Sequence, residues 1–249
     1  MIILKSKKEI EIMREAGKIT AGALELIEKN IQPGVTTACL NNIAEEYILS
    51  HNAVPAFKGY QGFPASICAS VNAQVVHGIP NDERLKEGDI VSIDIGAVFR
   101  GYYGDAARTF PVGNISEEAA LLIKTTEESF FEGLKYARVG YRLSDMSHAI
   151  QAYVESRGYS VVKSFVGHGI GRNMHEDPQV PNFGNPGMGP RFRPGMTLAV
   201  EPMVNQGTDE VEILADGWTV LTKDRSLSAH YENTIVITDE EPLILTLEG

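Results

Sequence analysis

The 249-residue sequence contains only two cysteines, Cys39 and Cys68, and no CxxC pair. A disulfide framework and a thiolate metal site are therefore not expected. No apolar run approaches the roughly 20 residues that a membrane-spanning helix needs, and the apolar stretch at the N-terminus is too short for a signal peptide. These absences predict a cytoplasmic protein in a reducing compartment, with no membrane partner.

Positive charge is also scarce. Lys plus Arg total 22 against 33 Asp plus Glu, which gives a formal net charge of -11. A surface of this sign repels phosphate backbones, so we expect no specific nucleic-acid partner. Hydrophobic residues make up 43% of the chain, which suits a protein with a buried core and excludes a disordered acidic chain. Nothing in the sequence signals an oligomer, so we expect a monomer.

Capping signals, helically spaced apolar residues and glycine turns delimit the predicted elements. In each half of the chain they form the same order: two helices, a His-Gly turn, and two strands that each carry a carboxylate. Helices are predicted after Ser6 and at 37–50, 116–137 and 144–156. Strands are predicted at 90–99, 102–111, 196–204 and 230–238, with strand pieces near 160–167, short β pieces within 55–80, and a Gly/Pro-rich loop at 177–194.

The repeated order can be checked by residue matches. At an offset of 107, Gly88 and Asp94 fall on Gly195 and Glu201, and at an offset of 106 a set of helix residues beginning with Gly34 falls on a similar set beginning with Gly140. The tetrapeptide at 76–79 also echoes the one at 167–170. We therefore predict a single domain, 1–249, built from pseudo-two-fold halves at about 1–113 and 114–249 around a shared site.

Four carboxylates lie in these predicted strands: Asp94, Asp105, Glu201 and Glu232. Taken singly, each could lie on a solvated strand face. However, Asp94 and Asp105 are about equidistant from a turn at 99–100, so they would face each other across a hairpin. The repeat places Glu201 and Glu232 in the equivalent position. Two like charges about 4 Å apart repel by roughly 4 kcal/mol at an effective dielectric near 20, so the cluster needs neutralisation.

Two divalent cations would supply that charge, because the basic residues nearby in sequence, Arg100 and Arg108, are too few. His168, between two glycines that let the backbone turn sharply toward the ligands, is the best candidate for an imidazole ligand. Oxygen-rich ligation with one nitrogen argues against structural zinc and favours a two-metal hydrolytic centre that activates a bridging hydroxide, with Glu201 shuttling the proton. Co, Mn, Fe(II), Zn and Ni all remain open. A mononuclear iron oxygenase, which needs two histidines and one carboxylate, is disfavoured.

Several motifs resemble the bacterial type I methionine aminopeptidases. They are the segments 60–72, 76–80, 92–96, 101–105, 167–171 with His175, and Glu201-Pro202-Met203. The resemblance covers nearly the whole chain. It implies a pita-bread fold, an α/β (α+β) architecture whose curved antiparallel sheet is covered by helices. It also implies removal of the initiator methionine from nascent polypeptides, with transient contact to the ribosome. The metal ligands it implies are Asp94, Asp105, His168, Glu201 and Glu232, of which Asp105 and Glu232 bridge.

The same resemblance implies residues that contact the substrate. His77 would hydrogen-bond the scissile amide region and help protonate the leaving amine, and His175 would stabilise the tetrahedral oxyanion. Cys68 is not expected to be a nucleophile, because no base is placed for it. The implied methionine pocket is lined by Tyr60, Phe63, Cys68 and Trp218, with Met174 at its edge.

Two other functions are compatible with the same fold. A Xaa-Pro aminopeptidase or prolidase-like peptidase would usually carry an additional N-terminal domain, whereas this chain begins at the first helix of the catalytic half. A catalytically silent binding module of this fold would usually have lost metal ligands. All five candidate positions here hold residues that can ligate a metal, which favours an enzyme.

Overall fold

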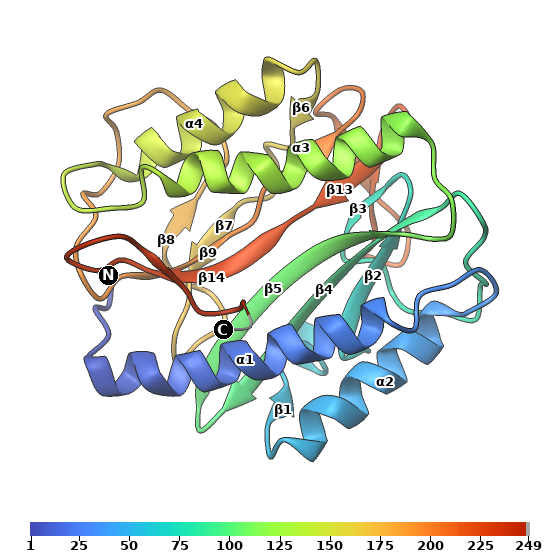
Figure 1. The fold of residues 1–249 in the computed structure, drawn as a ribbon, viewed down its shortest axis with the longest axis horizontal. Coiled ribbons are helices and arrows are strands. Elements are labelled where there is room, and N and C mark those ends of the chain that lie inside the picture. Colours follow the sequence, from blue (N-terminus) through green and yellow to red (C-terminus); the bar gives the residue numbers. More distant parts are fainter. Residues whose placement is uncertain (248–249) are drawn as a thin grey trace.

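In a computed structural model, which describes residues 1–247, helices cover a curved sheet. The last two residues of the predicted second half, 248–249, lie outside the described part. Figure 1 shows helices α1 and α3 on either side of the long central strands β5 and β14, with α2 beside α1 and α4 beside α3. The helices are α1 (Lys7–Glu28), α2 (Thr37–Ser50), α3 (Glu117–Leu134) and α4 (Leu143–Glu155), with a short 3-10 helix at Tyr60–Gly62. None of these helices is long and apolar enough to cross a membrane.

The main sheet has a nearly symmetric strand order. Its centre reads β2-β4-β5-β14-β9-β7, so each half of the chain contributes three consecutive strands that meet where β5 pairs with β14. The strands of this sheet are β1 (Val54–Pro55), β2 (Ile67–Val71), β4 (Ile90–Phe99), β5 (Tyr102–Pro111), β7 (Gly167–Gly169), β8 (Glu176–Val180), β9 (Thr197–Val200), β14 (Glu232–Val236) and β15 (Leu243–Ile244). This order is the one that two related halves would give.

Two smaller sheets flank the site. One joins β13 (Ser228–His230), β10 (Met203–Asn205) and β6 (Ser160–Val161), and the other joins β11 (Val211–Ile213), β12 (Val220–Thr222) and β3 (Gln74–Val76). Each pair of helices closes an apolar core of its own. Leu40 on α2 packs in the first core with Ile93, and Phe130 on α3 packs in the second with Leu198.

Two strand predictions and one loop prediction need correction. The strand expected at 196–204 is broken at Glu201-Pro202, because proline offers no N–H to continue the ladder, and the chain passes into another sheet as β10. The strand expected at 230–238 is interrupted at Tyr231, between β13 and β14, where the Tyr231 N–H donates to the carbonyl oxygen of Pro202 at 3.2 Å. The Gly/Pro-rich loop at 177–194 contains most of β8, which pairs with β7.

The register of the first hairpin also differs from the prediction. Gly96 pairs with Asp105, and Asp94 pairs with Ala107, so the two aspartates are diagonal neighbours on one face rather than direct partners. The turn residues are Arg100 and Gly101, both with positive φ, one position later than expected. Such a turn favours glycine at its second position, and Gly101 thereby shifts the register by two residues.

Helix α1 lies directly against the backbone of its neighbours. Its N-terminus is fixed by a capping box between Ser6 and Glu9, as predicted. A Cβ added at Gly17 would come within 2.0 Å of the carbonyl oxygen of Leu245, and one added at Gly104 on β5 would come within 2.7 Å of the Gly17 nitrogen. Glycine at these positions therefore lets α1 pack closely on the sheet that carries Asp105.

We expect Gly17→Ala to lower the free energy of unfolding by about 1–3 kcal/mol, because the added methyl meets rigid backbone. The loss should appear even though alanine is the better helix former by about 1 kcal/mol. Urea denaturation of the metal-free protein measures it. The exposed neighbour provides the control, since Lys18→Ala should change stability by less than about 0.5 kcal/mol. A Gly17→Ala variant as stable as the parent would contradict this close packing.

Candidate metal centre

The four predicted carboxylates converge on one cavity of about 280 Å³. Asp94 and Asp105 come from the hairpin β4–β5, Glu232 begins β14, and Glu201 directly follows β9. The pairing of β5 with β14 brings Asp105 and Glu232 to the middle of the sheet, where their exposed fractions are 5% and 2%. Acidic side chains from both halves of the chain therefore share one buried site.

His168 joins this cluster from β7. Its Nε2 lies 3.6 Å from Oε1 of Glu201 and 3.9 Å from Oδ2 of Asp105. Its Nδ1 lies 2.9 Å from the carbonyl oxygen of Gly169, an arrangement that places the ring proton on Nδ1 and leaves the Nε2 lone pair free for a ligand.

The glycines on either side of His168 have a different role from the expected one. Their φ angles are not in the positive region. A Cβ at Gly167 would come within 2.4 Å of the Ala199 carbonyl oxygen, and one at Gly169 within 2.1 Å of the Asp177 carbonyl oxygen. Glycine is therefore required because neighbouring backbone approaches β7 closely, not because the chain turns sharply there.

The carboxylates are poorly neutralised by protein groups. Burial raises the pKa values of Asp94, Glu201 and Glu232 well above their usual range, and the negative charge of neighbouring carboxylates raises them further. Burial raises the pKa of Asp105 to about 7. The guanidinium of Arg108 donates to the carbonyl oxygens of Ala107 and Glu232 rather than to a carboxylate. The four carboxylates would therefore still repel one another in the metal-free protein.

Several buried ligand atoms have no hydrogen-bond partner within residues 1–247. They include Oδ1 of Asp94, Oδ1 of Asp105 and Oε1 of Glu232. Potential ligand atoms lie within 4.8 Å of one another in two groups that share Glu232, one with Asp105 and His168 and the other with Asp94 and His230. Carboxylate oxygens with an imidazole nitrogen suit divalent metal ions, so these residues fit a metal centre.

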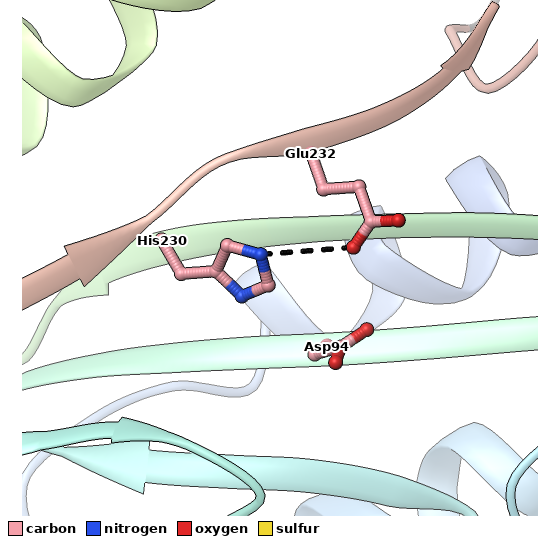
Figure 2. Close-up of side chains that lie close together, drawn as sticks. All are labelled: Asp94, His230 and Glu232. Carbon is pink, nitrogen blue, oxygen red and sulfur yellow. Dashed lines mark ion pairs between the residues drawn. The ribbon is translucent and has the colours of Figure 1, made fainter. Parts of the chain in front are cut away.

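His230 was not singled out by the sequence analysis. It ends β13, and its Nε2 lies 3.7 Å from Oε2 of Glu232 and 3.9 Å from Oε2 of Glu201. Figure 2 shows its ring beside Glu232, with Asp94 on β4, which β5 separates from β14. Its spacing from Glu232 could have identified it, because residues two positions apart in a strand point to the same face of the sheet.

The two predicted substrate histidines lie beside the metal-ligand cluster. His77 follows β3 with a positive φ of 60°, and its ring packs edge-on against Phe165 and Trp218 at 5.6 and 6.3 Å. Burial, followed by the influence of His175, lowers the pKa of His77 to about 4. His175 lies with its ring 4.2 Å from that of His168, and its Nδ1 is 2.7 Å from the hydroxyl of Tyr60. Both rings line the same cavity as the carboxylates.

The other end of the cavity is apolar. Phe63 packs edge-on against Trp218 at 5.1 Å between ring centres, and Cys68 and Met174 belong to the same cluster. Burial raises the pKa of the Cys68 thiol well above its usual range, and the charge of Asp94 raises it further, so the thiol stays protonated and unreactive. All the predicted site residues thus line one cavity, and the structure adds Phe57 and Gln61 to its wall.

The raised pKa of Asp105 gives a prediction for the metal-free protein. Between its ordinary value of 3.8 and about 7, the folded state holds a proton that the unfolded state has lost, so this group's contribution to stability falls as pH rises. Asparagine cannot titrate. The stability of Asp105→Asn relative to the parent should therefore increase with pH in this window, by up to about 1.4 kcal/mol per pH unit. Urea unfolding in excess chelator measures it, and a difference independent of pH would contradict the burial argument.

Known proteins resemble this chain in sequence and in fold. The sequence pattern of metallopeptidase family M24 matches residues 11–239. The methionine aminopeptidase of Clostridium acetobutylicum is 60% identical over 248 residues, which cover 99% of each chain. The crystal structure of methionine aminopeptidase from Rickettsia prowazekii superposes with a TM-score of 0.98 at 44% identity, covering 99% of this chain and 100% of that one. Prolidase from Pyrococcus furiosus, at 22% identity and a TM-score of 0.78 over 99% of this chain and 66% of its own, shares the fold alone. The chain therefore has the pita-bread fold and belongs to metallopeptidase family M24, among its methionine aminopeptidases.

Proposed function

We propose that this chain removes the N-terminal methionine from nascent proteins and peptides by metal-dependent hydrolysis. The observation that carries the proposal is a cavity with two chemically distinct ends. One end holds four carboxylates and His168, and the other is a cluster of aromatic and sulfur-containing side chains. The first end suits the activation of water beside a peptide bond, and the second suits an apolar, flexible side chain. Similarity to methionine aminopeptidases over the whole chain supports the same activity.

Two divalent ions are proposed at the acidic end, with Co, Mn, Fe(II), Zn and Ni as candidates. When bound, such ions lower the pKa of water and polarise the scissile carbonyl. The ligands would include Asp105 and Glu232 as bridging residues, because both are deeply buried in the middle of the cluster and Glu232 belongs to both groups of potential ligand atoms. The full ligand set is Asp94, Asp105, His168, Glu201 and Glu232.

Glu201 is proposed to move the proton of the attacking water. Its carboxylate is partly exposed to the cavity, whereas Asp105 and Glu232 are buried, and burial raises its pKa, which allows it to hold a proton during the reaction. His77 is neutral near pH 7 and would donate a hydrogen bond at the scissile amide. With the Tyr60 hydroxyl donating to Nδ1, His175 carries its proton on Nε2 and can donate to the developing oxyanion.

The methionine side chain is proposed to occupy the apolar end. Aromatic faces there match the polarisable thioether of a substrate methionine, and Met174 can adapt its shape at the edge. The walls proposed for this pocket are Tyr60, Phe63, Cys68 and Trp218, with Met174.

The remaining proposals concern the chain as a whole. Strands from both halves pair within one sheet, which supports a single catalytic domain at 1–249. The proposed partners are nascent chains that begin with methionine, which the protein would encounter during transient contact with the ribosome. The protein is proposed to act as a cytoplasmic monomer, in keeping with its sparse cysteines and acidic surface.

A comparison of two peptides tests the function. With Mn(II), Co(II) or Fe(II) supplied, we expect the rate of hydrolysis of Met-Ala-Ser to exceed that of an Ala-Pro peptide by at least about 100-fold. The reason is that the apolar end of the cavity binds the methionine side chain better than the shorter side chain of alanine. Release of free amino acid measures both rates. Faster cleavage of the proline peptide would favour the Xaa-Pro peptidases, and binding of Met peptides without turnover would favour a silent binding module.

The role of His77 can be separated from metal binding. We expect His77→Ala to lower kcat by about 10²–10⁴-fold, the usual range for a proton-transferring group, while metal content stays at the parent level. Steady-state kinetics and elemental analysis measure the two quantities. The exposed His148 on α4 provides a matched control, since His148→Ala should alter neither. Loss of metal from His77→Ala would show that this histidine is misassigned.

A further inference from the structure

His230 is a second buried imidazole at the metal centre. Its exposed fraction is 1%, and its Nε2 has no hydrogen-bond partner among the residues that the structure describes. A buried polar atom without a partner costs free energy unless something else satisfies it. The proposed ligand set of four carboxylates and His168 leaves this nitrogen without a role.

The distances around Nε2 suit a shared cation better than direct hydrogen bonds. Oε2 of Glu232 lies at 3.7 Å and Oε2 of Glu201 at 3.9 Å, both beyond the length of a hydrogen bond. Ligands about 2.1 Å from one ion lie about 3.0–4.2 Å from each other, depending on the coordination angle. Ligand atoms of His230, Glu232 and Asp94 all lie within 4.8 Å of one another, and Figure 2 shows the three side chains close together.

His230 also completes a symmetric arrangement around Glu201. One carboxylate oxygen of Glu201 faces Nε2 of His168 at 3.6 Å, and the other faces Nε2 of His230 at 3.9 Å. The first imidazole groups with Asp105 and the second with Asp94, and both groups include Glu232. Each of the two proposed metal positions would thus have one imidazole and a share of Glu232, and Asp94 would belong to the position beside His230.

A neutral imidazole is well suited to this place. The cavity already holds four acids, and the nearby guanidinium of Arg108 donates to backbone carbonyls instead of neutralising them. A further carboxylate would add to the repulsion, whereas an imidazole adds a ligand without adding charge. Nitrogen ligation also raises the affinity of a site for Mn, Fe, Co and Zn relative to Mg or Ca.

We propose that His230 is a metal ligand whose Nε2, together with Asp94 and Glu232, holds the ion opposite the one held by His168. This inference rests on the two-metal centre of the proposed function. It predicts that both ions carry a nitrogen ligand, and that the position beside Asp94 is weakened selectively when this nitrogen is removed.

Co(II) provides two separate readouts. Equilibrium dialysis of the metal-free protein should give two equivalents of bound Co(II), and His230→Gln should weaken one of them by at least about tenfold while leaving the other unchanged. Glutamine keeps a hydrogen-bonding side chain but lacks the imidazole nitrogen. His148→Gln on the surface of α4 should bind Co(II) like the parent.

Proton NMR of the Co(II)-loaded parent counts the imidazole ligands without any substitution. We expect two strongly shifted, solvent-exchangeable imidazole N–H signals, one of which disappears in His230→Gln. One such signal in the parent, or unchanged Co(II) affinity in His230→Gln, overturns the role of His230 while leaving the two-metal centre intact. Fewer than two equivalents of Co(II) in the parent overturns the two-metal centre itself, and no bound Co(II) overturns both.

Discussion

The structure depends on placing four mutually repelling carboxylates in the interior of a protein. Ionised carboxylates are costly to bury, and two of them about 4 Å apart repel by roughly 4 kcal/mol at an effective dielectric near 20. Arg108, the guanidinium close to them, donates to backbone carbonyls, and burial raises the pKa of each acid. Such a cluster keeps its charge at neutral pH only if divalent cations share its oxygens, so the fold is organised around a metal centre.

The symmetric sheet brings the acidic residues of both halves together at the metal centre. Each half supplies one central strand pair with acidic residues, and the pairing of β5 with β14 joins them across the pseudo-axis. The breaks at Pro202 and Tyr231 end the regular ladder beside Glu201 and Glu232, leaving these side chains at a point where the strands diverge into a second sheet. His168 and His230 each lie near a different carboxylate oxygen of Glu201, and the apolar cluster around Phe63 lines the same cavity.

Much of this could be predicted from the sequence, because strong local signals agree with the fold. The helix at 37–50 and the strands at 90–99 and 102–111 have the predicted bounds, and the carboxylate pattern located the site. Other features depend on tertiary contacts. The register of the first hairpin was set by Gly101, and the need for Gly167 and Gly169 arises from backbone approaching from distant residues. His230 was missed because the charge argument required only one imidazole ligand, and His168 already supplied it.

Anomalous diffraction at the manganese edge, from crystals grown with Mn(II), tests the central claim most directly. The account predicts two peaks about 3.5–4 Å apart, surrounded by the carboxylates of both halves and by His168. Absence of manganese from the cavity, with the four carboxylates turned toward solvent or toward protein cations, would contradict it.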